Sequence, residues 1–299
     1  MILDDIKPNT VIVIAGPTAS GKSGLALDIA MRYNGVVINA DSMQIYKGTP
    51  IISAAPTAED KLKAEHLLYE IFEPSERGSV AEWLGLATAA IKNAQKKGLL
   101  PVVVGGTGFY IESLVRGTSP IPETKQEIKS KVAALVAEKG LTGVYAYLAE
   151  VDEAGAAMVK PRDTTRVRRA LEIFLDTGKS ISEWFKLPLE RPLPKADFRI
   201  IPLLPELKDL EKKCSERFDL MMKKGAVEEV KNLLAMGLDD TLPAMKAIGV
   251  PELAAYLRGE TSLEEAVALA KLHTRQYAKR QLTWFRNRLK NLPAAFPAN

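Results

Sequence analysis

The residues with the clearest chemical signature form the stretch Gly16-Pro17-Thr18-Ala19-Ser20-Gly21-Lys22-Ser23, which fits the pattern G-x-x-x-x-G-K-[ST]. Its two glycines, Gly16 and Gly21, allow the backbone to curl so that successive N–H groups point at phosphate oxygens. Lys22 would meet the terminal phosphates, and Ser23 would hold Mg²⁺. We expect this stretch to bind a diphosphate or a nucleotide; the alternative is a bare glycine-rich turn.

A second candidate is Asp41, which directly follows the apolar run 36–40. That run is typical of a buried strand, and ligands of open α/β sheets bind beyond the carboxyl ends of the strands. Asp41 would therefore face the phosphate loop. We expect its carboxylate to take part in chemistry; the alternative is a turn or cap residue.

Basic residues gather in two places. Four arginines lie between Arg162 and Arg169 against one acid, and seven Lys or Arg residues without any acid lie between Lys271 and Lys290. Such clusters on a chain of net charge +4 suggest a polyanionic partner larger than a nucleotide. For either cluster alone, a solvated helix face is the alternative.

The elements that must position these residues follow from apolar periodicity. Apolar runs predict strands at 11–15, 36–40, 99–104 and 198–204, with a short candidate at 66–69. Helical spacing predicts helices over 24–33, 79–97, 162–176, 206–224 and 262–289.

Arg217 lies beside the apolar stripe of its helix, where it either snorkels or reaches into a site. The glycines of 105–108 either make a tight turn or let a ligand approach closely.

Strands that alternate with helices around a phosphate loop predict an α/β fold, a P-loop NTPase-like parallel sheet flanked by helices. Residues 117–197 differ, because prolines border them and only helical patterns lie between. We expect a catalytic core of residues 1–116 plus 198–299 and a helical insertion domain of residues 117–197.

Composition excludes several classes of protein. Apolar residues make up 46% of the chain and charged residues 26%, which is ordinary for a soluble globular protein. No run of 18 apolar residues occurs, and the first ten residues are unlike a signal peptide. Cys214 is the only cysteine, and His66 and His273 are the only histidines, so neither a disulfide nor a zinc site is expected. We expect a cytoplasmic protein without a membrane partner.

Taken in order along the chain, several stretches together resemble the tRNA dimethylallyltransferase (isopentenyltransferase) family. They are residues 16–23, Asp41-Ser42-Met43-Gln44-Ile45-Tyr46, residues 104–110, residues 166–172, Arg217 with residues 228–230, residues 247–249, and residues 274–286, whose sequence is TRQYAKRQLTWFR. The last motif is long and specific, and the resemblance spans nearly the whole chain. The chain departs from the family at Ala55, where the family usually carries a lysine.

The resemblance implies transfer of a dimethylallyl group from dimethylallyl diphosphate to N6 of the adenosine just 3′ of the anticodon. Lys22, Arg217 and Mg²⁺ held by Ser23 would stabilise the diphosphate leaving group. Asp41 would orient the amine and accept its proton. The adenine base would leave the anticodon stack and enter a pocket.

The same resemblance places further residues against the anticodon stem-loop of tRNA. They are Asp41, Ser42, Met43, Gln44, Thr107, Lys129, Thr165, Arg166, Val167, Arg168, Arg169, Arg275 and Lys279. The basic helices would hold the RNA through its phosphates. We expect the protein to act as a monomer.

Two other classes of protein use parts of this pattern. A P-loop kinase of a small metabolite, or an enzyme that prenylates free AMP, has no need of the arginine-bearing insertion or of the basic terminal helix. A non-catalytic RNA-binding protein with a nucleotide switch leaves Asp41 unexplained.

Overall fold

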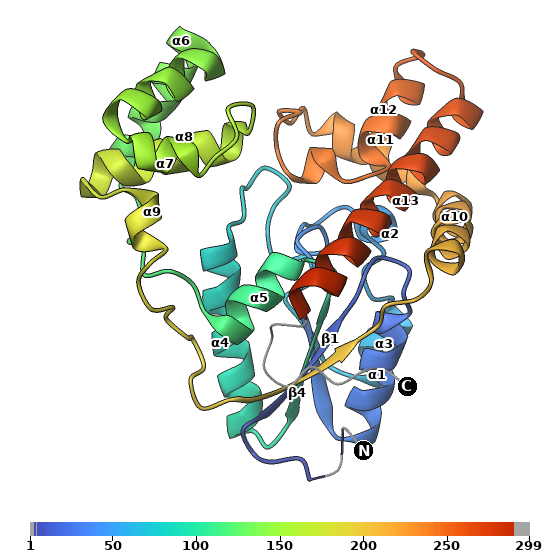
Figure 1. Ribbon diagram of the computed structural model, residues 1–299. Helices are drawn as coiled ribbons and strands as arrows, with labels where there is room; N and C mark the ends of the chain where they lie inside the picture. Colours follow the sequence, from blue (N-terminus) through green and yellow to red (C-terminus); the bar gives the residue numbers. More distant parts are fainter. Residues whose placement is uncertain (1–2, 4, 290–299) are drawn as a thin grey trace. The chain divides into compact units, whose positions relative to one another are not determined.

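Five strands pair into one parallel sheet in the computed structural model, which describes residues 3 and 5–289 (Figure 1). They are β1 (Thr10–Ala15), β2 (Gly35–Asn39), β3 (His66–Leu67), β4 (Leu100–Gly105) and β5 (Asp197–Pro202). The strand order is β3-β2-β4-β1-β5, and every pairing is parallel. The carboxyl ends of β1, β2 and β4 therefore open at one edge, which is where such sheets bind ligands. The predicted α/β fold is confirmed.

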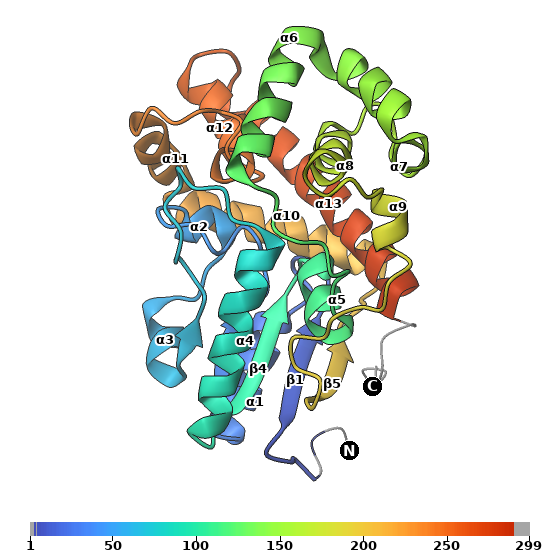
Figure 2. The ribbon, with the colours of Figure 1, turned by 90° about the vertical axis from the view of Figure 1, so that its left-hand side faces the viewer.

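Both faces of the sheet are covered, because successive side chains of β1 alternate between two cores. Val11 and Val13 pack on one face with α4 (Val80–Lys96) and α5 (Gly108–Arg116). Ile12 and Ile14 pack on the other face with α1 (Lys22–Arg32). In Figure 2, α4 stands in front of the sheet and α1 behind it. Burial on both faces is the reason why the central strands β1 and β4 are almost continuously apolar in sequence.

Trp83 fixes α4 to the strand that precedes Asp41. Its indole Nε1 donates a hydrogen bond of 2.9 Å to the backbone oxygen of Asn39, the last residue of β2. Its ring stacks on Tyr110 of α5, with 4.4 Å between the ring centroids. The carboxyl end of β2 is thereby anchored to both helices of this face.

The short strand β3 ends earlier than predicted. Only His66 and Leu67 pair with β2, whereas the sequence suggested a strand over 66–69. Leu68 has φ of 64° and Glu70 has φ of 52°, both in the left-handed region. Extended pairing cannot continue through such backbone angles.

Further helices belong to the same compact unit as the sheet. They are α2 (Pro50–Ser53), α3 (Ala58–Lys63), α10 (Leu207–Lys223), α11 (Ala226–Ala235), the 3-10 helix η1 (Ala244–Lys246), α12 (Val250–Leu257) and α13 (Leu263–Arg288). A capping box starts α13: the Ser262 hydroxyl accepts from the Glu265 N–H, and the Glu265 carboxylate accepts from the Ser262 N–H. Among the described residues, no helix is long and apolar enough to cross a membrane.

Residues 116–191 form a second compact unit, here called the insertion unit. Its helices are α6 (Gln126–Val151), which is interrupted at Gly140, α7 (Glu153–Ala157), α8 (Thr164–Thr177) and α9 (Ile181–Trp184). They share a core that includes Val132, Leu148 and Leu171. The sequence suggested an end at residue 197. The unit ends earlier because Leu193 is buried in the core of the other unit, which consists of the chain up to residue 115 and from residue 192 onward and is here called the sheet unit.

Candidate active site

The loop between β1 and α1 has the geometry of a phosphate-binding loop. Gly21 has φ of 88°, a left-handed angle that favours glycine, and α1 begins directly after it. At Gly16, a Cβ atom would lie 2.5 Å from the backbone oxygen of Leu203, so a side chain does not fit there. The loop therefore turns tightly at the start of α1, where free N–H groups and the helix dipole favour an anion.

Lys22 is buried at the base of this loop. Its Nζ donates to the backbone oxygen of Pro17 at 3.1 Å. Burial lowers the pKa of Lys22 to about 8, the charge of Asp41 raises it, and that of Arg217 lowers it further. The ammonium group is therefore weakly solvated, which strengthens its attraction for a phosphate group that enters.

Asp41 is held firmly just beyond β2. Its N–H donates to Asn39 Oδ1 at 2.8 Å, and its Oδ1 accepts from the Met43 N–H at 3.0 Å. Asn39 Nδ2 donates to the backbone oxygens of Asp41 and Leu68. The turn thus fixes one carboxylate oxygen and leaves Oδ2 on the side of Gly106.

The loop after β4 packs against the turn that carries Asp41. Thr107 Oγ1 accepts from the Ser42 N–H at 2.8 Å and donates to Ser42 Oγ at 3.1 Å. Thr107 and Ser42, both predicted from the sequence to contact RNA, are therefore brought together. Gln44, which was also predicted to contact RNA, makes contacts within the protein instead. Its Nε2 donates to the backbone oxygens of Ser53 and Ala54 and so supports α2.

A single cavity of about 730 Å³ joins the phosphate loop to Asp41. Residues 18–24, residues 41–44 and Arg217 all line it. Arg217 is half-buried, and burial lowers its pKa while Asp41 opposes that shift. Because Arg217 lines the cavity, the structure supports the interpretation in which its side chain reaches into a site.

One wall of this cavity is apolar. Met43, Ile52, Phe218, Met221 and Ile248 contribute to it. Phe218 and Met221 belong to the buried core between α10, α11, α12 and α13, so this wall is held rigidly. The cavity therefore offers cations, one carboxylate and a hydrocarbon surface, which suits a substrate with an anionic end and an apolar end.

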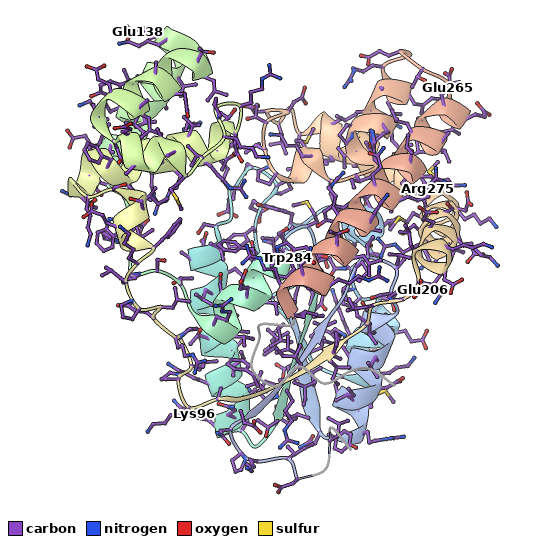
Figure 3. All side chains as sticks on the ribbon, viewed as in Figure 1. Lys96, Glu138, Glu206, Glu265, Arg275 and Trp284 are labelled. Atoms are coloured by element: carbon purple, nitrogen blue, oxygen red, sulfur yellow. The ribbon has the colours of Figure 1, made fainter. Side chains whose placement is uncertain are left out.

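Arg275 and Lys279, the basic residues predicted to contact RNA near the end of the chain, both lie on α13. Figure 3 shows Arg275 toward the middle of α13 and Trp284 nearer its end. Lys279, Arg280 and Trp284 line a second, more open hollow of about 580 Å³. Arg280 also lines the first cavity, so the two hollows adjoin at this residue. Lys290, the last member of the cluster, lies outside the described residues.

The remaining predicted RNA contacts belong to the insertion unit. Thr165 and Arg166 are exposed on α8, and Arg166 pairs with Asp163 at 2.8 Å. Arg168 is half-exposed, Arg169 donates to Thr124 Oγ1, and Lys129 lies 3.6 Å from Glu123. The prediction that Val167 contacts RNA is wrong. Its side chain is fully buried in the core of the unit, which excludes it from direct contact with RNA.

Two residues of α13 were not singled out from the sequence. Tyr277 lines the cavity, and burial followed by the charge of Asp41 raises its pKa. Gln281 is buried and hydrogen-bonds with the backbone of two separate loops. Both lie in the stretch 274–286, which carries the resemblance to the family but gave neither residue a role of its own. The available signal was the place of Gln281 on the apolar face of the helix, with Ala278, Leu282 and Phe285.

Comparison with known protein families gives a consistent result. The IPP transferase family model matches residues 44–288. A tRNA dimethylallyltransferase of Rhodospirillum centenum is 47% identical over 279 residues, which cover 93% of this chain and 89% of the relative. Its counterpart in Rhodospirillum rubrum is 44% identical over 280 residues, covering 94% of this chain and 86% of the relative.

Solved structures agree with these relatives. The crystal structure of a tRNA isopentenylpyrophosphate transferase from Bacillus halodurans matches with a TM-score of 0.68 and 34% identity, covering 97% of this chain and 89% of that one. A eukaryotic dimethylallyltransferase, described as acting on tRNA, matches with a TM-score of 0.84 and 29% identity, covering 97% of this chain and 74% of that one.

Proposed function

The chain belongs to the tRNA dimethylallyltransferase (IPP transferase) family, and from this premise we propose its reaction. It transfers the dimethylallyl group of dimethylallyl diphosphate to N6 of the adenosine just 3′ of the anticodon in tRNA. The observation that carries the proposal is that Lys22, Arg217 and Asp41 line one cavity with an apolar wall. This set matches a donor that has an anionic leaving group and an apolar C5 group, together with an acceptor that must lose a proton.

The donor side of the cavity stabilises the leaving group. As the bond between C1 and the diphosphate oxygen breaks, negative charge builds up on the diphosphate. Lys22, Arg217 and the N–H groups at the start of α1 meet that charge in a poorly solvated site. The apolar wall holds the dimethylallyl group and excludes water from the reacting carbon.

Mg²⁺ is the proposed cofactor, and the residues present fit it. Ser23 is exposed and lines the cavity. Among the described residues no group of three or more His, Cys, Asp or Glu could hold a metal ion by itself. Mg²⁺ often binds with few protein ligands and with oxygens of a substrate phosphate, which agrees with Ser23 as its protein ligand. When bound, it neutralises charge on the diphosphate.

The acceptor side of the cavity activates the adenine amine. N6 attacks C1, the new C–N bond forms, and the N6 proton passes to Asp41. Asp41 suits this role because Oδ1 is occupied by the Met43 N–H, which leaves Oδ2 for the proton. Ser42, Met43, Gln44 and Thr107 form the surroundings in which the extruded base is held.

Basic residues hold the anticodon stem-loop. On α13 these are Arg275 and Lys279, and in the insertion unit they are Lys129 and the arginines of α8 with Thr165. Contacts of this kind neutralise phosphates and carry most of the affinity for RNA. A monomer is the proposed active form.

The decisive experiment offers dimethylallyl diphosphate, labelled in the C5 group, with bulk tRNA, with AMP or without acceptor. We expect label on adenosine N6 of tRNA and none on AMP. Label on AMP alone would indicate an AMP-prenylating enzyme. No transfer to either acceptor, together with phosphorylation of a small metabolite from ATP, would indicate a kinase.

A further inference from the structure

The side chain of Gln281 connects two loops that are far apart in sequence. Its Oε1 accepts from the backbone N–H of Thr18 at 2.9 Å, across 263 residues. Its Nε2 donates to the backbone oxygen of Gly106 at 2.8 Å, across 175 residues. The side chain is buried, with 7% exposed, so water does not readily replace either bond.

The two loops carry the two halves of the proposed reaction. Thr18 belongs to the phosphate loop that holds the leaving group. Gly106 precedes Thr107, which binds the backbone of Ser42 beside the base Asp41. The amide of Gln281 is therefore a direct connection between the donor loop and the acceptor loop.

Gly106 is shaped to receive this amide. A Cβ at Gly106 would lie 2.5 Å from Gln281 Nε2 and 3.3 Å from Asp41 Oδ2. Glycine thus permits the amide and the catalytic carboxylate to approach the same point. Of the neutral side chains of this length, only glutamine supplies an acceptor for one loop and a donor for the other.

We propose that Gln281 is a positioning residue, which fixes the separation of the leaving-group loop and the acceptor loop so that C1 and N6 meet in a reactive geometry. The inference rests on the proposed prenyl transfer. It assigns to Gln281 no contact with either substrate. Its loss should therefore reduce turnover and leave substrate binding nearly unchanged, because misplacement by about 1 Å can cost ~100-fold in rate.

The test compares Gln281→Met and Gln281→Glu with the parent chain. Methionine keeps the size of the side chain and removes both hydrogen bonds. Glutamate keeps the acceptor for Thr18 but turns a second oxygen toward the Gly106 oxygen and brings a carboxylate beside Asp41. Titration with inorganic diphosphate counts the binding-competent chains, so that kcat is expressed per intact site and misfolded protein does not contribute.

A matched control is Gln95→Met on α4, because Gln95 is a partly buried glutamine whose Nε2 has no hydrogen-bond partner. We expect kcat per site to fall by roughly 10–100-fold in both Gln281 variants, with KM for tRNA and for the donor within about threefold of the parent. Gly106→Ala, which crowds the amide from the other end, should lower kcat in the same way.

The outcomes separate this inference from the function on which it rests. If the parent chain does not prenylate tRNA, the proposed function fails. If the parent is active and the Gln281 variants match Gln95→Met in kcat per site, Gln281 has no positioning role and only this inference is overturned.

Discussion

Asp41 is the residue on which the proposed proton transfer depends. In Asp41→Asn, the amide oxygen can still accept from the Met43 N–H, as Oδ1 does now, but the side chain cannot take a proton from N6. We expect the rate of the chemical step to fall by roughly 10²–10⁴-fold, the usual contribution of a positioned general base. Single-turnover transfer of label to adenosine measures this step directly.

Asp28→Asn is the control for Asp41→Asn, because Asp28 is an exposed carboxylate on α1. It should prenylate tRNA at the parent rate. If Asp41→Asn binds both substrates and reacts within a few-fold of the parent, Asp41 only shapes the turn after β2, and another group accepts the proton.

Lys22 should make binding of the diphosphate depend on pH. Its pKa is lowered to about 8, chiefly by burial, so the free protein loses this positive charge as the pH rises through 8. Bound diphosphate favours the charged form, and affinity should therefore weaken by up to about tenfold per pH unit above 8. Titration with inorganic diphosphate between pH 7 and 9.5 measures the effect. In Lys22→Arg, whose guanidinium stays charged, the loss of affinity that comes from deprotonation of the lysine should be absent.

The same shift has a consequence for stability. The unfolded chain binds the lysine proton at the ordinary pKa of 10.5, and the folded chain binds it at about 8. The unfolded state thus holds more protons between these values, and the contribution of Lys22 to the free energy of unfolding rises from pH 8 to 10.5. Burial of this charge lowers stability at neutral pH, as is common for functional groups.

At the scale of single residues, the sequence predicted the parts of the site that lie in local motifs. The phosphate loop is one continuous stretch, and Asp41 follows a recognisable strand. Gln281 was missed because its two partners are backbone atoms of distant loops. No pattern in the neighbouring sequence specifies such partners; only the packing of α13 over the sheet edge does.

At the scale of elements, helices with strong apolar periodicity were predicted from the sequence, whereas a very short helix was not. The helix expected over 206–224 is α10 (Leu207–Lys223), and the one over 162–176 is α8 (Thr164–Thr177). The four-residue α2 had no such signal. Its N-terminus is stabilised by a tertiary contact, since the Glu229 carboxylate of α11 accepts from the N–H groups of Ile51 and Ile52.

The exposed face of α8 should contribute to RNA affinity through charge. The side chains of Arg166 and Arg169 are 72% and 40% exposed, so their guanidinium groups can reach phosphates. Replacing both with glutamine should weaken tRNA binding and reduce the slope of log affinity against log salt by about one to two units. Turnover at saturating tRNA should be largely retained, because neither residue lines the cavity.

Lys96→Gln with Lys97→Gln is the matched control for the α8 variant. It removes two exposed charges at the end of α4 that adjoins the amino end of β4. This pair should leave the salt slope unchanged. Equal slopes for the α8 variant and the parent would mean that the arginine face is only a solvated surface.

At the scale of the whole molecule, the division into two units follows from how each buries its apolar residues. The sheet unit has separate cores on its two faces, and the insertion unit has one core of its own. Prolines in the sequence indicated the borders approximately. They did not reveal that Leu193 packs into the sheet core, because a single leucine in a proline-rich stretch has no periodicity to interpret.

The insertion unit should be removable without unfolding the sheet unit. Its ends meet, since the Thr118 N–H donates to the Glu190 oxygen at 3.1 Å and the Glu190 N–H donates to the Thr118 oxygen at 2.9 Å. A glycine linker of about two residues could therefore join Gly117 to Arg191, because hydrogen-bonded antiparallel neighbours are spanned by such short turns. We expect cooperative thermal unfolding, affinity for inorganic diphosphate within about threefold of the parent, and tRNA affinity at least about tenfold weaker.

Loss of cooperative unfolding would show that the sheet unit needs the insertion to fold. A shortened chain that binds tRNA as tightly as the parent would mean that the arginines of α8 contribute nothing to RNA binding.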